Sequence, residues 1–502
     1  MRVLAVVSLT LLLLGTVAYS AGSAWYVRSD AYRRGCEAVL SSRLELPADI
    51  GRVVPRSRRA RSFEDVSIWL PQRRDRAVHC DRATLILAPT PEEPDGYELE
   101  LQGGMAEIST RTWLRDDYRG VVDAGLRGGL APGGPRRLVF TDMQIDFARD
   151  PFRAALHEAS GSLVFIGAER GSATLLCREF NGYFPSDPVL LTAQFSQAET
   201  GIRIDSLSLQ IPAMPMLALG PSRLLGPAVS GGWFDGRLEY SETDAGRLAV
   251  LRGVLRDADL HELSAGAAPF IVRGTCPELE LIEFRMLNNE PQSLRFRGAL
   301  ADLQLGDFLA LIGGERVDGR LDFSVGRALV DVDGVDEIAA AGSGSGIDLE
   351  ALSAVFGQGL IGGVLEIEIS DLLVRDNRLI ALDAVVRVRG DDEHPAFVER
   401  RLLNTLAQRF LKFTLPGFLP ARVPYQELGV RVEVRDEVLR LMGTHGPDGN
   451  TILTVSLFGA DMGLIRAPLP EIDLRPQFDT WREIAIERMR EFQTRRGSDS
   501  PD

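Results

Sequence analysis

Short runs in which apolar and polar residues strictly alternate recur along this chain, and they limit the fold more than any other feature. Alternation with a period of two is what a β-strand with one buried face requires. The clearest runs lie at 66–70, 143–147, 365–369 and 430–434. Their polar positions are mostly charged, which favours an antiparallel sheet wet on one face over a parallel sheet buried on both. The pattern predicts a mainly β fold with a few helices.

The N-terminus differs from the rest of the chain. Residues 3–27 carry no charge, and this run exceeds the roughly 20 residues that a membrane-spanning helix needs. A cleaved signal peptide is the alternative, because small residues near Ala21 and Ala24 could form a processing site. We favour an uncleaved transmembrane signal-anchor at 1–28, because Trp25 lies where an interfacial aromatic belt is expected. Either alternative predicts an exported body.

One strand opening recurs in the middle of the chain. Residues 236–240, 319–323 and 363–367 read GRLEY, GRLDF and GVLEI. Two of these copies follow a short apolar segment that ends at glycine, at 309–313 and 352–357, which predicts a short helix or turn. Stacked units of helix, turn, strand and hairpin would build an elongated body. A chance match between strand-rich segments is the alternative.

Several short motifs predict turns and irregularities. Asp205 and Ser206 interrupt an alternating run, which indicates a bulge or a tight turn. Asp-Asn at 376–377 and Asp-Gly at 333–334 are typical of hairpins. The run GSGSG at 342–346 does not match a nucleotide-binding loop and predicts a flexible turn.

Three segments interrupt the strand pattern. Residues 120–137 are rich in glycine and proline, which predicts a surface loop or linker. Residues 397–413 predict an amphipathic helix with one apolar stripe. A proline-rich segment near the C-terminus leads into a second predicted helix from about Phe478. The stripe of the first helix consists of Val398, Leu402, Leu406, Phe410 and Phe413.

The amphipathic helix has two interpretations. It could lie on a membrane surface, because basic residues such as Arg400 and Lys412 decorate its polar side. We favour a helix that caps the sheet. The predicted division of the chain is 1–28 for the anchor, 29–200 for a first β region, 201–394 for a repetitive β region, 395–420 for the amphipathic helix, 421–470 for C-terminal β-hairpins, and 471–502 for the proline-rich segment and C-terminal helix.

Composition and motifs exclude several classes of function. A net charge of −15 would repel phosphate backbones, so no nucleic-acid partner is expected. The five histidines are too scattered for a metal motif, and no serine lies in a nucleophile elbow. No catalytic residue, metal or cofactor is therefore predicted. The four cysteines contain no CxxC pair, which leaves a disulfide open.

The segment after the apolar run is more specific. It reads YRRGCEAVL at 32–40 and LELPADIGRV at 44–53. It resembles the start of the AsmA-like proteins of Gram-negative envelopes, in which a segment of the type L-x-L-P-x-x-I-G-x-V precedes the first strands. The strands so expected here lie at 63–70 and 83–87. Segments 298–325, 344–390 and 423–443 also resemble the strand and short-helix units of that superfamily, which includes TamB.

This resemblance implies an elongated, curled antiparallel sheet with a taco-like apolar groove. It further implies a single-pass inner-membrane protein with its body in the periplasm, which binds or conducts phospholipid in outer-membrane biogenesis. A non-enzymatic scaffold that assembles other envelope proteins is the alternative. The positions expected to face the groove are Val66, Ile68, Leu70, Met143, Ile145, Phe147, Leu365, Ile367 and Ile369.

Overall fold

The computed structural model describes most of the chain between residues 26 and 475. The predicted anchor, apart from 26–28, and the predicted C-terminal helix lie outside the described residues, as do Leu70, Phe410 and Phe413. Within the described part, no helix is long and apolar enough to cross a membrane. The residues not described are 1–25, 45–46, 58, 70–75, 90–95, 110–134, 150–151, 167–168, 199–200, 220–230, 244–245, 265–271, 289, 311–316, 333, 358, 409–413, 415–416, 418, 458–459, 468, 470 and 476–502.

The fold is mainly β, as predicted, with 70% strand and 14% helix. The helices are α2 (Asp30–Leu44), α4 (Leu260–Ser264), α5 (Leu305–Leu309), α6 (Leu349–Phe356) and α7 (Arg400–Leu406), with a 3-10 turn at Met216–Leu219. The strands are β1 (Ala48–Pro55), β2 (Ala60–Trp69), β3 (Arg76–Leu87), β4 (Tyr97–Ser109), β5 (Pro135–Arg149), β6 (Phe152–Ile166), β7 (Arg170–Cys177), β8 (Glu179–Phe180), β9 (Val189–Ala198), β10 (Gly201–Pro215), β11 (Trp233–Thr243), β12 (Gly246–Asp259), β13 (Thr275–Leu287), β14 (Glu290–Gln304), β15 (Arg320–Asp331), β16 (Gly334–Asp348), β17 (Ile361–Gly362), β18 (Val364–Arg375), β19 (Arg378–Arg389), β20 (Phe397–Glu399), β21 (Arg422–Arg435), β22 (Val438–Gly443), β23 (Thr451–Leu457), β24 (Ala460–Arg466) and β25 (Ile472–Asp473).

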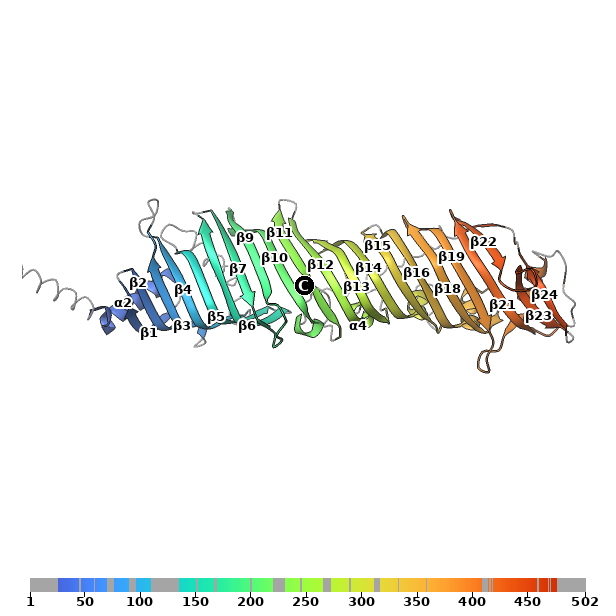
Figure 1. The fold of residues 1–502 in the computed structure, drawn as a ribbon, viewed down its shortest axis with the longest axis horizontal. Helices are drawn as coiled ribbons and strands as arrows, with labels where there is room; N and C mark the ends of the chain where they lie inside the picture. Colours follow the sequence, from blue (N-terminus) through green and yellow to red (C-terminus); the bar gives the residue numbers. More distant parts are fainter. Residues whose placement is uncertain are drawn as a thin grey trace, which may run out of the picture. The chain divides into compact units, whose positions relative to one another are not determined.

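The chain divides into two compact units. Unit 1 comprises Met1–Leu224 and Asp235–Val250, and unit 2 comprises Leu225–Phe234 and Leu251–Asp502. In unit 1 the strands pair in the order β1, β2, β3, β4, β5, β6, β7, β9 and β10. In unit 2 the order from β13 is β14, β15, β16, β18, β19 and β21, and Figure 1 shows these strands side by side.

Most of these pairs are antiparallel, as predicted, but β4 and β5 are parallel. Residues 110–134 connect these two strands. A parallel pair needs a crossover of about a dozen residues or more, and this connection is long enough. Alternation could not reveal the direction of β5, because side chains alternate in the same way in both senses.

The local irregularities follow the predictions in part. The register of β9 and β10 shifts between Ile204 and Ser206, which confirms the bulge at Asp205. The turn at Asp376 and Asn377 joins β18 to β19, with φ angles of 51° and 60°. Two successive positive φ values are typical of the tight turns that match the twist of a hairpin.

The run 342–346 is not a flexible turn, contrary to the prediction, because it lies within β16. A Cβ atom at Gly342 would come within 2.7 Å of the Phe323 ring. A Cβ atom at Gly344 would come within 2.6 Å of Ile367 Cγ2. Large side chains of the neighbouring strands therefore pack over these two glycines. The sequence pattern alone could not predict this packing.

A helix-turn-strand unit recurs in unit 2. The first N–H of each short helix donates to the carbonyl of the glycine that precedes the next long strand. These bonds join Leu260 to Gly274, Leu305 to Gly319 and Leu349 to Gly363, each at 3.0 Å. The predicted strand openings at Gly319 and Gly363 are thereby confirmed, whereas the helix before Gly319 spans Leu305–Leu309 and most of the predicted 309–313 segment lies outside the described residues.

The first predicted copy of the repeat, at Gly236, is wrong. Gly236 lies inside β11, and the structural equivalent is Gly274, whose following residues lack the GRL pattern. In each copy a residue with positive φ precedes the helix by three positions, at Asp257, Asp302 and Gly346. Such residues bend a strand, so each strand turns toward its helix at the same point.

Side chains of α2 take the place of a neighbouring strand along β1. Glu37 Oε1 accepts a hydrogen bond from the Ile50 N–H at 3.0 Å, and Arg33 Nη1 donates to the Ile50 carbonyl at 3.1 Å. Ser41 Oγ accepts from the Ala48 N–H at 2.9 Å. The segment expected only to precede the first strands thus itself forms β1. Because unpaired strand edges invite pairing with other chains, α2 protects this edge.

Replacing Glu37 with alanine should loosen this edge. The variant leaves the Ile50 N–H without its acceptor, and an unsatisfied group of this kind costs about 1–3 kcal/mol. Hydrogen exchange at the Ile50 amide should therefore become faster, while distant strands are unaffected. Asp30→Ala is the matched control, because Asp30 is 77% exposed and lies 3.5 Å from Arg33. Equal exchange in both variants would contradict this role of Glu37.

Candidate functional site: the apolar face of unit 2

One face of the unit 2 sheet is apolar over several strands. Cross-strand partners project from the same side of a sheet, so rows of partners define a face. One row, for example, joins Leu300, Phe323, Gly342, Ile369 and Ala384 across five strands. We call the four successive rows the apolar face: Leu281, Phe296, Ala328, Ile338, Val374; Leu279, Gly298, Val325, Ala340, Leu372, Leu382; Leu300, Phe323, Gly342, Ile369, Ala384; and Leu321, Gly344, Ile367, Val386.

Most of the large side chains of this face are only half-buried, although Val325 and the small Ala328 are buried. Phe296, Phe323, Ile338, Ile367 and Ile369 all keep part of their surface accessible. Side chains that fill the core of a packed domain normally lose nearly all of theirs. This stretch of the apolar face is therefore not filled by the described part of the chain, and its side chains can contact another apolar molecule.

The opposite face carries ion pairs between neighbouring strands. Arg431 contacts Asp383 at 2.7 Å, and Arg435 contacts Asp371 at 3.2 Å. Further pairs on this face are Arg297 with Glu280, Arg327 with Glu337, and Arg387 with Glu368. The unit 2 sheet thus has one face with ion pairs and one apolar face, and side chains of the two faces alternate along the strands between the bulges.

The pair of Asp383 and Arg431 makes stability depend on pH. Hydrogen bonds that the Arg431 guanidinium donates to the Asp383 carboxylate hold the pKa of Asp383 below its usual value. The stabilisation is therefore present above the unfolded-state pKa of about 4 and is lost as pH falls through the lower, folded-state value. Asp383→Asn should reduce stability slightly at pH 7, by less than about 1 kcal/mol, because the Arg431 side chain is 50% exposed and water screens the pair. Urea midpoints of both proteins should converge at lower pH, and a constant difference would contradict this assignment.

At the β19–β24 end, the apolar face is covered by the chain itself. A buried cluster there joins α6, α7, β20, β21, β23 and β24. Leu403 and Leu453 are each 1% exposed, and Val423 and Val455 are fully buried. Leu365, Val386 and Leu428 pack against this cluster from the sheet. The face therefore changes from half-exposed to filled within unit 2.

The predicted positions in unit 2 fall on both sides of this change. Ile367 and Ile369 lie in the half-exposed rows. Leu365, at the start of the same strand, packs against the buried cluster. All three project from one face, as alternation requires, but they differ in what covers them.

The predicted positions in unit 1 also lie within strands. Val66 is 8% exposed and packs with Cys80 and Ala83, with Leu40 of α2 against them. Met143 is buried opposite Ala159, whereas Ile68 and Ile145 are half-buried. Phe147 lies in β5 opposite Ala154. Leu70 falls outside the described residues.

The predicted helix at 397–413 begins later than expected. Phe397–Glu399 form β20, so Val398 is a strand residue and not a member of the helical stripe. Val398 is 2% exposed and pairs with Ile361 and Val423, and this pairing overrides the helical spacing. Leu402 and Leu406 lie on α7 and pack against the buried cluster. This packing favours the capping interpretation over the membrane-surface one.

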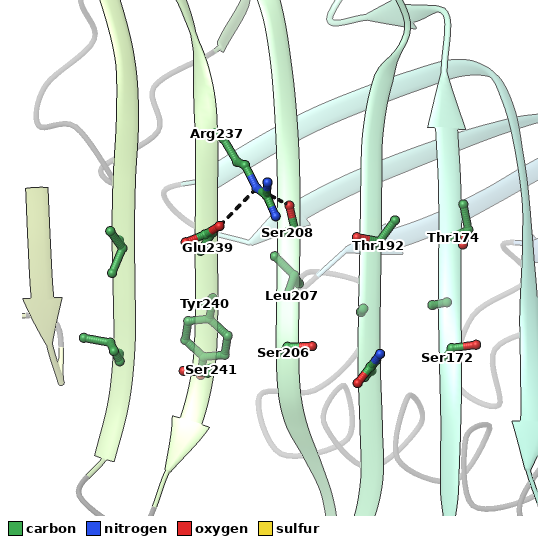
Figure 2. Close-up of a pocket in the computed structure, with 15 residues that line it drawn as sticks. Ser172, Thr174, Thr192, Ser206, Leu207, Ser208, Arg237, Glu239, Tyr240 and Ser241 are labelled. Atoms are coloured by element: carbon green, nitrogen blue, oxygen red, sulfur yellow. Dashed lines mark hydrogen bonds and ion pairs between the residues drawn. The ribbon is translucent and has the colours of Figure 1, made fainter. Parts of the chain in front are cut away.

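Unit 1 holds a shallow hollow of about 550 Å³ where β7, β9, β10 and β11 lie side by side (Figure 2). Hydroxyl side chains from all four strands, such as Ser172, Thr192, Ser208 and Ser241, line it. Arg237 donates to Ser208 at 2.8 Å and contacts Glu239 at 3.2 Å, so its guanidinium is already bound. The hollow offers neutral hydrogen-bonding groups on an open sheet surface.

The four cysteines are free thiols. Burial raises the pKa of Cys177 and of Cys276 to about 11, and it also raises that of Cys80. A thiol with a raised pKa is protonated at neutral pH and is a weak nucleophile. These three side chains therefore serve packing, which answers the question of disulfides that the sequence left open.

Sequence reasoning missed the part of the apolar face on β13, β14 and β15. The alternating pattern was present in the sequence but was interrupted. Leu279 and Leu281 alternate with polar residues only up to a bulge at Ile282. Beyond the bulge the apolar positions shift by one residue, and Phe284 lies on the same face as Leu281. Phe296 and Phe323 are the largest half-exposed side chains in these rows. An allowance for one bulge per strand would have found them.

The arrangement can bind an apolar ligand along several strands, with water held on the other face. Its chemistry is that of an extended surface, since the rows contain only apolar residues and glycine. No protein-family model, curated protein or solved structure matches this chain. The composition of the apolar face is therefore the guide to function.

Proposed function

We propose that this protein binds the acyl chains of phospholipids on the apolar face of unit 2 and takes part in the biogenesis of the outer membrane. The observation that carries the proposal is the half-exposed state of Phe296, Phe323, Ile338, Ile367 and Ile369. Large apolar patches are rarely left in water unless they bind something. The uncharged rows suit an acyl chain, which has no hydrogen-bonding groups to satisfy.

The energetics of such binding are favourable. Each acyl methylene that leaves water contributes about 0.8 kcal/mol, so a few methylenes match the cost of ordering the chain. Half-buried side chains also lose the rest of their accessible surface when the ligand arrives. A headgroup would remain in water, because the apolar rows offer it no polar partner.

We further propose that the sheet curls around this face to form a groove. The support is the residues with positive φ near the ends of β12, β14 and β16, at Asp257, Asp302 and Gly346. Bulges of this kind increase local twist and bend a strand, and they are a common route to curvature in sheets. A curled sheet would surround an acyl chain and remove more of its surface from water than a flat one.

The proposed location is the inner membrane, with the body in the periplasm. Residues 3–27 are uncharged and could anchor the chain, and α2 follows this run closely before it contacts β1. The resemblance of residues 32–53 to AsmA-like proteins supports the same location. In this arrangement the lipid ligand comes from the membrane that holds the protein.

A scaffold that recruits envelope proteins through sheet edges is the second candidate. Edge recruitment needs free N–H and C=O groups along a strand. At β1, Glu37, Arg33 and Ser41 already bind those groups at Ile50 and Ala48. This occupation favours the lipid-binding function over recruitment at that edge.

Site-specific photo-crosslinking in cells tests the proposal. A diazirine amino acid at Ile367 should yield phospholipid adducts, because that side chain lies on the apolar face. The same amino acid at Glu368 is the matched control, since this neighbour is exposed on the charged face. Lipid adducts at 367 and not at 368 would support lipid binding. Protein adducts alone at 367 would instead favour the scaffold.

A further inference from the structure

We infer that the apolar face of unit 2 ends in a stop at β21–β24, so that acyl chains enter and leave along β13–β18 and do not pass the C-terminal end. The inference rests on the proposed function and decides between holding lipid and conducting it past this end. It follows from the way the side chains of this one face change from half-exposed to fully buried along the sheet.

The stop is built from apolar side chains with almost no accessible surface. Leu403 from α7, Val398 from β20 and Leu453 from β23 are each 2% exposed or less. In the sheet itself, Val434 of β21 is 1% exposed and pairs with Leu382 of the apolar face. A side chain without accessible surface has no room for a ligand, because cores are packed with few voids. The rows of the apolar face therefore end in the core of the chain.

Hydrogen bonds between separate segments of the chain stabilise the stop. Arg400 Nη1 donates to the carbonyls of Gly417 at 2.9 Å and of Leu419 at 2.7 Å. The Tyr425 hydroxyl, in a buried position, donates to the Gly362 carbonyl at 2.6 Å. A buried hydrogen bond such as that of Tyr425 is costly to break, because it leaves a group unsatisfied. The stop is thus an integral part of the fold and not a segment that rests on the sheet.

The half-exposed rows and the stop differ in how much side-chain surface a ligand could contact. Leu281, Leu321 and Leu372 lie in the half-exposed rows, whereas Leu403 and Leu453 belong to the stop. All five are leucines. Their exposure therefore differs while their chemistry does not, which makes one reagent suitable for both regions.

The experiment uses the full chain, expressed in cells with photo-leucine in place of leucine and purified with its lipids. This isosteric residue leaves the fold intact and labels both regions at once. After irradiation, mass spectrometry maps lipid adducts to single residues. Leu373 provides the internal control, because it follows Leu372 in β18 and projects from the opposite face.

The expected result is lipid adducts at Leu281, Leu321 and Leu372, with yields at Leu403 and Leu453 lower by more than about tenfold, since buried side chains lack ligand contacts. Comparable yields in both regions would overturn the stop and leave the lipid-binding function standing. Absence of lipid adducts at every leucine would overturn both. Adducts at Leu372 and Leu373 in equal yield would reveal nonspecific labelling of the surface, which would also count against both.

Discussion

Replacing Ile369 with aspartate should abolish phospholipid binding while the protein remains folded. Ile369 is half-buried in the middle of the apolar face, between Gly342 and Ala384 in the neighbouring strands. An aspartate there keeps its charge by contact with water in the free protein. A bound acyl chain would exclude that water, and an unpaired buried carboxylate costs several kcal/mol. Lipid per protein in native mass spectrometry should fall by more than about tenfold, since every 1.4 kcal/mol corresponds to a factor of ten.

The matched control for this variant is Glu368→Gln. Glu368 is the adjacent residue on the charged face, where it contacts Arg387 at 3.9 Å. Its replacement also changes the charge of β18 by one, but on the side away from the apolar rows. Lipid content should therefore match the unmodified protein. Retention of lipid by Ile369→Asp, in protein with an unchanged circular dichroism spectrum, would remove the apolar face as the binding surface.

Replacing Leu403 with alanine should cause the largest loss of stability. Leu403 is 1% exposed within the cluster that covers the apolar face near β21. Loss of a buried leucine side chain costs about 2–5 kcal/mol, because hydrophobic transfer is lost and a cavity remains. The first transition in urea should move to lower concentration, with reduced hydrogen-exchange protection in β21 and β23.

Phe308→Ala serves as the control for this second variant. Phe308 lies on the short helix α5 and is 42% exposed, so its truncation should change stability by less than about 0.5 kcal/mol. If Leu403→Ala had as small an effect as Phe308→Ala, the cluster would not be a packed core. In that case its filling of the apolar face could not act as a stop.

Much of the architecture was predictable from the chain. The runs at 66–70, 143–147 and 365–369 form β2, β5 and β18 wherever the residues are described, and the apolar members of β18 lie on one face. The bulge at Asp205 was visible as two polar neighbours in an alternating run. These features are local, because side chains alternate along a strand whatever the rest of the chain does.

Other features depended on contacts between distant segments. Val398 was expected in a helix, but Ile361 and Val423 pair with it on either side and make it a strand residue. The run 342–346 looked like a turn, although Phe323 packs over Gly342 and Ile367 packs over Gly344. In both cases the deciding neighbours lie more than a dozen residues away, which no local pattern includes.

The sequence by itself determined that this protein would be a mainly β chain with a charged face and an apolar face, because a period of two assigns every residue to one side of a strand. Only the tertiary structure decided where the apolar face stays half-exposed and where it is filled. Ile367 and Leu365 are equivalent in sequence pattern, yet only Leu365 packs against the buried cluster. The physical reason is that coverage is a property of packing between segments, whereas alternation is a property of the strand alone.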